Sequence, residues 1–348
     1  MVKKFKVRKK LGKTKKVFVA IFGGIALCIS IFFFLLYGPY DGFRNFWITS
    51  SMTTMSHQYL AKWFFSDKEI YKVLSMNGII EATGSSNPDL ISIKKYKTGA
   101  KVYKNKYEKE ILTKDEGNDL YKVIEVSGNF YKGYLVAIYD PSRVSLATSR
   151  YIGTRGEAIT TVAKNNDAII AINAGGFYDP DWNSNGALPH GVVISNGKLV
   201  SNFSKSNVGG GIVGFTKDDK FVLGKWSADK ALKMGIRDAV EFGPYLIVNG
   251  KSSFVKGNGG WGIAPRTAIG QRKDGIVLFL IINGRIPSSI GADMSDLTEI
   301  MENYGAYNAA NMDGGSSTEL VINNKIINKP VAAGKNGLRD LPTFWIVK

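Results

Sequence analysis

A run of 21 residues without a charged side chain, Val17 to Tyr37, constrains this chain more than any other feature. A stretch of that length is long enough to cross the hydrocarbon core of a bilayer as a helix. A cleavable signal peptide has a shorter apolar stretch followed by small residues, whereas the residues GPYD follow Tyr37. The sequence therefore predicts an uncleaved transmembrane anchor over residues 17–37.

The distribution of charge predicts the orientation of this anchor. The chain has 46 Lys and Arg against 29 Asp and Glu, and nine of the basic residues lie in residues 1–16, which contain no acid. By the positive-inside rule the basic tail stays in the cytoplasm, which makes the chain a single-pass membrane protein with an extracellular domain. The tail is expected to contact anionic lipid headgroups. The rest of the chain has no concentrated Lys/Arg stripe, so we expect no binding to nucleic acid.

Residues 38–119 are predicted to form a helical stalk followed by a polar linker. Apolar residues recur at spacings of three and four between Phe43 and Phe64, including Met55, which is typical of an amphipathic helix. Ser66-Asp-Lys-Glu69 is a capping-box pattern that predicts a second helix to about Met76. Residues 84–119, with the charged runs KKYK and KNKYEKE, are expected to form a tether with one edge strand at most.

Residues 120–348 are predicted to form one β-rich domain of the α+β class, with mixed sheets and few helices. Short β-rich runs are separated by glycine-rich turns. They do not alternate regularly with helices, which excludes a doubly wound sheet. The predicted strands are 134–139, 168–172, 191–195, 198–200, 221–223, 244–248, 276–282, 320–322 and 343–347. Two helices are expected, one from a capping box at 154–157 to about Asn165 and one with an apolar face over 297–304.

Cysteine and histidine counts limit the chemistry of the chain. The single cysteine, Cys28, excludes an intrachain disulfide and a cysteine-based zinc site. The two histidines, His57 and His190, argue against a histidine-rich metal centre. We expect no required cofactor, although the pair Asp179 and Asp181 is compatible with a calcium or magnesium ion.

Three polar clusters follow apolar strands of the predicted domain. They are residues 171–179 with His190 beyond them, residues 264–270 with Asn283-Gly284-Arg285 beyond them, and residues 308–318. Consecutive glycines let a ligand approach the backbone and expose N–H groups to anions. Arg266, between Pro265 and Ala268, is expected to be partly buried beside an anion. Each cluster also has a purely structural explanation, such as a turn or an internal ion pair, so the clusters favour a site without naming a reaction.

Five ordered segments together resemble the phosphodiester glycosidase family, in particular its bacterial membrane-anchored members. They are AINAGGFYDP (171–180), GVVISNGKLV (191–200), GPYLIVNGK (243–251), APRTAIGQRKDGIVLFLIINGR (264–285) and GADMSDLTEIMENYGAYNAANMDGGSSTELVINNK (291–325). The family often has Asp-Gly-Gly-Gly-Ser, whereas here Ser316 takes the place of the third glycine. The resemblance implies hydrolysis of a sugar-1-phosphodiester to free sugar and a phosphomonoester, on glycans of the cell envelope or an exopolysaccharide.

The resemblance also implies roles for individual residues. A phosphate leaving group is already a weak base, so its protonation matters less than in ordinary glycoside hydrolysis. Arg266 is expected to bind the phosphate, assisted by the N–H groups of Gly314 and Gly315. Asp313 is expected to act as base or nucleophile, and Asn173 and Asp179 to position sugar or water. His190 is expected to act as an auxiliary acid or base or to bind phosphate. The expected substrate-binding residues are Gly175, Gly176, Asp179, Thr267, Asn283, Gly314, Gly315 and Ser317.

Two other readings of the same residues stay open. Residues 120–348 carry 25 basic against 19 acidic side chains, which would suit a non-catalytic module that binds anionic glycans. Alternatively, Ser316 or Ser317 could be a nucleophile activated by His190. Neither serine lies in a G-x-S-x-G pattern, which argues against this esterase-like arrangement.

Overall fold

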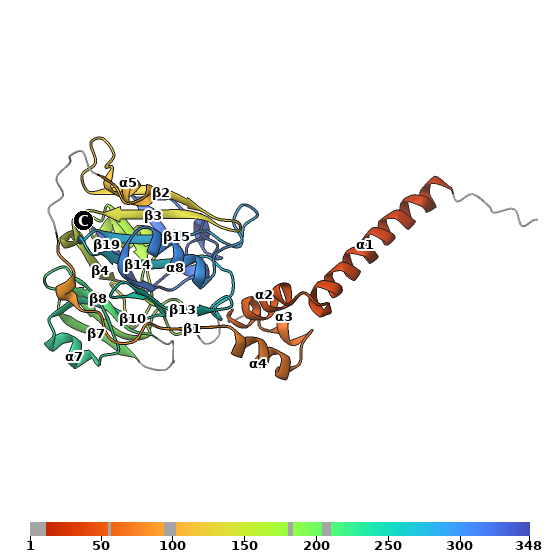
Figure 1. Ribbon diagram of the computed structural model, residues 1–348, viewed down its shortest axis with the longest axis horizontal. Helices are drawn as coiled ribbons and strands as arrows, with labels where there is room; N and C mark the ends of the chain where they lie inside the picture. Colours follow the sequence, from red (N-terminus) through yellow and green to blue (C-terminus); the bar gives the residue numbers. More distant parts are fainter. Residues whose placement is uncertain (1–11, 55–56, 94–101, 180–183, 204–209) are drawn as a thin grey trace, which may run out of the picture.

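The computed structural model describes residues 12–54, 57–93, 102–179, 184–203 and 210–348. Helix α1 (Lys13–Tyr37) projects away from the rest of the chain (Figure 1). It is long and apolar enough to cross a membrane, and most of its side chains, Cys28 included, are exposed. The predicted anchor lies entirely within this helix. Predictions for Met55, for the KKYK run and for Asp181 lie outside the described residues.

Three short helices, which we call the juxtamembrane module, follow α1. They are α2 (Asp41–Met52), α3 (Tyr59–Lys62) and α4 (Asp67–Met76). Where the sequence predicts one helix between Phe43 and Phe64, the structure has α2 and α3, and the exposed His57 lies between them. The predicted capping box of α4 is confirmed, since Ser66 and Glu69 each accept a hydrogen bond from the other's backbone N–H.

The juxtamembrane module packs on the end of α1 through its own small apolar core. The rings of Phe32 in α1 and Trp47 in α2 meet edge to face with their centroids 5.2 Å apart. Trp47 also donates from its indole N–H to the Leu60 carbonyl oxygen at 2.9 Å. The buried members of this core are Leu36, Ile48, Ala61, Phe65, Ile70 and Val73. The end of α1 and the module therefore form one packed unit.

The segment after the module lies along the β-rich body. Within the predicted tether over 84–119, the Ser86 N–H donates to the Leu223 carbonyl oxygen at 2.8 Å and the Ser92 N–H to the Lys273 carbonyl oxygen at 2.9 Å, so this part is attached to the body. Strand β1 (Gly78–Ile80) pairs with β13 (Phe254–Lys256). The carboxylate of Glu81 then accepts a hydrogen bond from the Tyr245 backbone N–H at 2.9 Å. Within the described part of residues 84–119, the structure has a 3₁₀ turn and helix α5 (Lys106–Leu112) but no strand.

Three antiparallel sheets build the body of the molecule. The seven-stranded sheet contains, in order, β12 (Lys251–Ser252), β11 (Tyr245–Val248), β16 (Ala306–Asn311), β14 (Arg266–Arg272), β15 (Val277–Ile282), β3 (Lys132–Ile138) and β2 (Tyr121–Ser127). One five-stranded sheet contains β7 (Lys198–Phe203), β6 (Gly191–Ser195), β10 (Ile236–Phe242), β8 (Gly211–Thr216) and β9 (Phe221–Gly224). The other contains β18 (Lys325–Ile326), β17 (Leu320–Ile322), β5 (Ile170–Asn173), β19 (Thr343–Val347) and β4 (Val144–Thr148).

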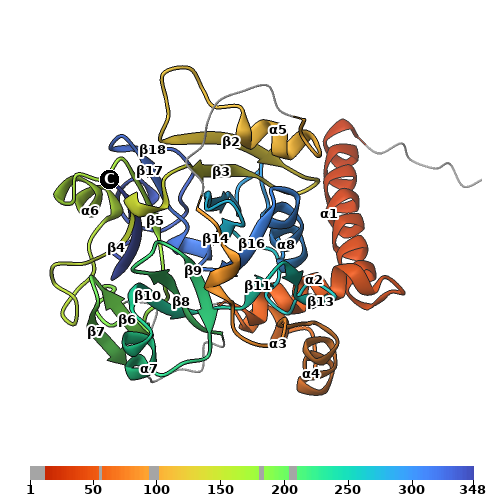
Figure 2. The same cartoon turned by 60° about the vertical axis from the view of Figure 1, so that its left-hand side comes forward.

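The three sheets share one buried core, and helices cover their outer faces (Figure 2). Because side chains alternate along a strand, each sheet turns every second residue inward. Large inward side chains from all three sheets are Phe215, Phe221, Tyr245, Phe279 and Trp345. On the outer faces lie α8 (Met294–Asn303) against the seven-stranded sheet, α6 (Ile159–Asn165) against the sheet of β5, and α7 (Ala228–Lys233) against the sheet of β10.

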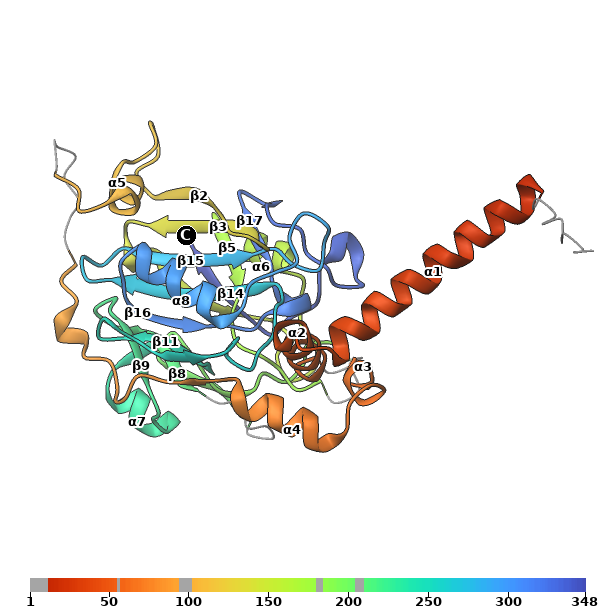
Figure 3. The same ribbon diagram turned by 45° about the vertical axis from the view of Figure 1, so that its right-hand side comes forward.

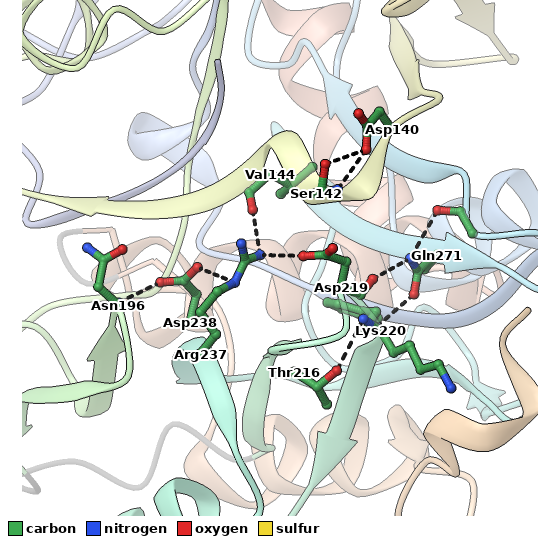
Figure 4. A network of polar contacts seen from close by, with 12 residues as sticks. Asp140, Ser142, Val144, Asn196, Thr216, Asp219, Lys220, Arg237, Asp238 and Gln271 are labelled. Atoms are coloured by element: carbon green, nitrogen blue, oxygen red, sulfur yellow. Dashed lines mark hydrogen bonds and ion pairs between the residues drawn. The ribbon is translucent and has the colours of Figure 1, made fainter. Parts of the chain in front are cut away.

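A polar network joins the two five-stranded sheets (Figure 4). Arg237 in β10 donates from Nη2 to the Val144 carbonyl oxygen of β4 at 2.7 Å. The same guanidinium forms ion pairs with Asp219 at 3.5 Å and Asp238 at 3.1 Å. The carboxylate of Asp238 also accepts the Asn196 backbone N–H at 2.9 Å. Burial raises the pKa of Asp238, so the nearby guanidinium compensates for the cost of a buried charge.

The predicted fold class is confirmed: the body is β-rich and of the α+β class, and a long apolar helix and a helical segment precede it. Every strand pairing among the described residues is antiparallel, so the sheets are not mixed in direction. The capping box predicted for α6 is wrong. Its N-cap is Ala158, without a side-chain hydrogen bond, because Glu157 instead binds Arg150.

Candidate active site

The three polar clusters meet where β5 ends, β14 begins and β16 ends. The residues after β16 form a turn that lies between the other two clusters. The Asp313 backbone N–H donates to the Ala174 carbonyl oxygen after β5 at 3.1 Å. Two residues later, the Gly315 N–H donates to the Pro265 carbonyl oxygen before β14 at 2.8 Å. The antiparallel sheets therefore bring together segments that are about 50 to 140 residues apart in the sequence.

Asn173 is the buried link between these clusters. Its Nδ2 donates to the Asp313 carbonyl oxygen at 2.6 Å. Its Oδ1 accepts hydrogen bonds from the Thr267 hydroxyl at 2.8 Å and from the Glu319 backbone N–H at 3.2 Å. Only 1% of Asn173 and none of Thr267 is exposed. The amide thus aligns the backbone that carries Asp313.

Asp313 is a half-buried carboxylate with an altered ionisation. Burial raises its pKa to about 6, although the hydrogen bond from Ser317 and the charge of Arg339 act in the opposite direction. One carboxylate oxygen also accepts the adjacent Gly314 N–H at 3.0 Å. A carboxyl group that ionises close to neutral pH is suited to accept a proton from a water molecule.

Gly314 and Gly315 allow the turn to approach β14 closely. A Cβ added to Gly314 would lie 2.9 Å from the Pro265 carbonyl oxygen, and Gly315 has φ +61°, which favours glycine. Their N–H groups, expected on a phosphate, donate to Asp313 and Pro265 in this structure. Ser316 does not have a positive φ. The position therefore does not require the third glycine that many family members have.

Arg266 is buried, and backbone carbonyl groups hold its side chain. Nε donates to the Ala292 oxygen at 3.1 Å, and Nη2 donates to the oxygens of Trp261 at 2.5 Å and Gly262 at 2.6 Å. These bonds use three of the five guanidinium N–H groups, and Nη1 carries the other two. Burial lowers the pKa of Arg266 to about 10, which leaves the group charged at neutral pH. Arg266 is thus more deeply buried than predicted, with 4% of it exposed, and the hydrogen bonds described for it go to carbonyl oxygens and not to an anion.

Two further arginines lie beside the Asp313 turn, and the sequence assigned no role to either. Arg285 is exposed, and its Nη1 donates to the Ser316 hydroxyl at 3.3 Å. Arg339 pairs with the buried carboxylate of Asp179, and its guanidinium carbon lies 4.6 Å above the centre of the Phe177 ring. Arg285 therefore offers an exposed cation beside the Asp313 turn, which suits an anionic ligand. Asp179 balances the charge of Arg339.

Glu319 is a further site residue that the sequence did not indicate. Its side chain is fully buried, and burial raises its pKa to about 8. Oε1 accepts the Arg339 backbone N–H at 2.7 Å, whereas Oε2 has no hydrogen-bond partner among the described residues. Burial therefore favours the protonated form of this acid. The surrounding run T-E-L-V-I is typical of a strand and carried no sign of this buried acid.

Gly175 and Gly176 follow β5, and His190 lies against this segment. The His190 backbone N–H donates to the Gly176 carbonyl oxygen at 2.9 Å, and the His190 ring packs edge-on against Tyr178. The Gly175 N–H donates to the Thr343 hydroxyl at 3.1 Å. Burial lowers the pKa of His190, so its imidazole is neutral at pH 7.

The two remaining predicted binding residues are engaged with the protein itself. Asp179 accepts the Ser184 N–H at 2.8 Å as well as pairing with Arg339. Asn283 accepts the Lys329 N–H at 2.7 Å and so joins two loops. Within the described ranges, no group of three or more His, Cys, Asp or Glu side chains could hold a metal ion.

Two known proteins are similar to this chain. The chain is 31% identical over 199 residues to the SPbeta prophage-derived uncharacterized protein YomE of Bacillus subtilis (strain 168). That alignment covers 55% of this chain but only 30% of the length of that relative. The chain also resembles the solved catalytic domain of zebrafish N-acetylglucosamine-1-phosphodiester alpha-N-acetylglucosaminidase, which is auto-inhibited by its pro-peptide. The TM-score is 0.54 at 20% identity, over 68% of this chain and 85% of that one.

The sequence model of one family covers the segments that build the site. It matches residues 166–348, which is more than half of the chain and includes β5, β14, β16 and the Asp313 turn. The chain belongs to the phosphodiester glycosidase family.

Proposed function

We propose that this protein hydrolyses a sugar-1-phosphodiester to free sugar and a phosphomonoester, with residues 120–348 as the hydrolase domain. The observation that carries this proposal is the position of Asp313. Its carboxyl group, with a pKa of about 6, lies on a turn that is hydrogen-bonded to the start of β14, where the buried Arg266 begins the strand. A carboxylate and a fixed cation side by side match the two charges that develop when a glycosyl–phosphate bond breaks.

In the proposed reaction, the bond between the anomeric carbon and the phosphate oxygen breaks, and its electron pair stays with the phosphomonoester. The two N–H groups on Nη1 of Arg266 and the exposed guanidinium of Arg285 stabilise the negative charge on that product. The oxygen of water forms the new bond to the anomeric carbon. Asp313 either takes the proton of this water directly or first attacks the carbon as a nucleophile.

The sequence and α1 support a location at the membrane. The basic tail over residues 1–16 supports a cytoplasmic N-terminus and a hydrolase domain on the other side of the membrane, by the positive-inside rule. The substrate is then a glycosyl phosphodiester of the cell envelope or of an exopolysaccharide. No cofactor is part of the proposal, and addition of EDTA, with and without added calcium or magnesium, tests for a divalent cation.

The first experiment uses the full-length protein in detergent micelles and an α-N-acetylglucosamine-1-phosphodiester. Released reducing sugar and the conversion of phosphodiester to phosphomonoester, followed by phosphorus NMR, measure the reaction. We expect Asp313→Asn to abolish both signals. If the wild-type protein leaves a panel of sugar phosphodiesters intact, hydrolysis of those substrates is excluded.

The excess of basic over acidic side chains in residues 120–348 supports one alternative. In this alternative, the protein is a tethered module that binds anionic glycans without cleaving them. A binding module needs no carboxylate beside a phosphate, so Asp313→Asn would leave binding of an anionic wall polymer intact or tighten it. Binding by the wild-type protein, together with an intact substrate panel, would favour this alternative over the hydrolase.

A further inference from the structure

The juxtamembrane module lies against the β-rich body (Figure 3). It contacts a loop whose carbonyl oxygens bind Arg266. This loop, residues 257–263, follows β13. Asn258 donates from Nδ2 to the Thr49 hydroxyl of α2 at 2.5 Å. At the other end of the loop, the Ile263 backbone N–H donates to the Ser50 hydroxyl at 3.3 Å. Two adjacent residues of α2 therefore bind both ends of the loop.

The backbones also approach one another closely at this contact. Gly262 has φ +60°, and a Cβ added there would lie 2.6 Å from the Cα atom of Ser50. Asn77, which ends α4, accepts the Asn258 backbone N–H at 3.0 Å. The loop and the module thus meet with no room for a side chain between them at Gly262.

The same loop holds the guanidinium of Arg266. Both hydrogen bonds of Nη2 go to this loop, to the carbonyl oxygens of Trp261 and Gly262. Two successive contacts therefore connect α2 with Arg266. Ser50 contacts Gly262 and Ile263, and the Gly262 carbonyl oxygen accepts a hydrogen bond from the guanidinium. A displacement of the loop would turn the guanidinium about its Nε bond to Ala292.

We propose that Thr49 and Ser50 are positioning residues for the active site: by fixing the 257–263 loop, helix α2 sets the orientation in which Arg266 meets the substrate phosphate. The module then supports the active site through this loop, in addition to packing on the end of α1. This inference rests on the proposed function for its kinetic test, and its structural part can be tested without any substrate.

The test uses the full-length protein in detergent micelles with the double variant Thr49→Val/Ser50→Ala. Both substitutions are close in size to the native side chains and remove only the hydroxyls that face the loop. The matched control is Thr53→Val/Ser75→Ala, because the hydroxyls of these exposed residues bond only to carbonyl oxygens of their own helices. One hydrogen bond corresponds to about fivefold in an equilibrium. We therefore expect kcat/KM to fall about fivefold or more in the first variant and to stay at the wild-type value in the control.

A double-mutant cycle separates positioning from general stability. Arg266→Lys keeps the charge but cannot form the same set of bonds to the loop. If α2 acts through Arg266, adding Thr49→Val/Ser50→Ala to Arg266→Lys causes no further loss of kcat/KM. An additive loss, or an unchanged kcat/KM in the double variant alone, would overturn the proposal.

Amide hydrogen exchange over residues 257–266 provides the readout that needs no substrate. We expect faster exchange there in Thr49→Val/Ser50→Ala and unchanged exchange in the control. If the wild-type protein releases no sugar, the proposed function fails, and the contact between α2 and the loop is still tested by exchange. That contact is refuted if amide exchange over residues 257–266 is the same in Thr49→Val/Ser50→Ala as in the wild type. Should the double variant not fold, Ser50→Ala alone gives the same comparison.

Discussion

Asn173 and Asp313 are 140 residues apart in the sequence and are joined by a hydrogen bond of 2.6 Å from Asn173 Nδ2 to the Asp313 carbonyl oxygen. Asn173 ends β5 in one sheet, and Asp313 follows β16 in another. Because Asn173 Oδ1 also accepts the Thr267 hydroxyl at the start of β14, one amide connects all three polar clusters. The position of the proposed catalytic carboxylate therefore depends on the packing of two sheets.

Asn173→Asp should strongly reduce sugar release. The substitution keeps the size of the side chain but replaces the donor to the Asp313 carbonyl with a second acceptor, and it adds a negative charge beside Asp313. We expect kcat to fall at least about tenfold, with the apparent pKa of the reaction rising above that of the wild type. A pH series of initial rates measures both quantities.

A matched control for this substitution is Asn166→Asp. Asn166 caps the end of α6 and likewise donates from Nδ2 to a carbonyl oxygen, that of Val162, at 2.9 Å. This variant should keep the wild-type rate and pH dependence. Equal losses in both variants would mean that Asn173 contributes only to stability.

The pH dependence of the wild-type protein follows from the ionisation of Asp313. Burial raises the pKa of Asp313 to about 6, and the proposed base or nucleophile works only when ionised. Sugar release should therefore rise as the pH increases through about 6 and level off above it. A rate that already reaches its plateau at pH 4.5 would show that another group carries the reaction.

The elements that the sequence predicts well are those in which local residues determine the structure. β6, β17 and β19 were predicted residue for residue, because each is a short β-branched or apolar run bounded by turn-forming residues. The capping box at Ser66 likewise uses only residues in contact along one helix turn.

The elements that the sequence missed depend on contacts between distant segments. β14 begins with Arg266 and contains Gln271, and β16 contains Asn308 and Asn311, so neither reads as an apolar strand. Their polar side chains are buried because other strands supply partners, such as the Phe221 N–H that donates to Gln271 at 2.7 Å. Tertiary contacts of this kind override strand propensity.

The same distinction between local patterns and distant contacts applies to the residues of the candidate site. The glycine pairs, Asp313 and Arg266 were indicated by local motifs, and the structure places Arg266 and Asp313 on neighbouring segments. Arg339 and Glu319 were not indicated, since no local pattern marks them. They belong to the site only because the chain returns to β5 through β17 and β19.

Arg285→Ala should weaken substrate binding without destabilising the fold. The Arg285 side chain is exposed and donates to Ser316, beside the turn that carries Asp313. A hydrogen bond to a charged group contributes about 1.5–3 kcal/mol, so loss of the contact to phosphate should raise KM about tenfold or more. Steady-state kinetics and the melting temperature, compared with the exposed control Arg143→Ala, check both parts. A wild-type KM would remove Arg285 from the phosphate site.

Glu319→Gln should stabilise the protein, and the gain should grow with pH. Burial raises the pKa of Glu319 to about 8, from an ordinary value of 4.5. Between these two values, the unfolded chain loses the proton and the folded protein retains it. The stability of the wild-type protein therefore falls by about 1.4 kcal/mol per pH unit in that range. Glutamine has no such proton, so the variant should gain about 3–6 °C in melting temperature per pH unit relative to wild type.

Glu157→Gln supplies the comparison with the opposite sign. Burial acts to raise the pKa of Glu157, but the hydrogen bonds from Arg150 outweigh it and lower this pKa below its ordinary value. Ionised Glu157 thus stabilises the fold above that value, and this contribution is lost as the pH falls through the lower pKa of the folded state. The melting temperature of Glu157→Gln should therefore be below that of the wild type at pH 7 and approach it in acid. The melting temperature of Glu319→Gln should equal that of the wild type near pH 4.5 and exceed it at pH 8. Parallel melting curves for Glu319→Gln and wild type from pH 5 to 8 would mean that Glu319 is already ionised in the folded protein.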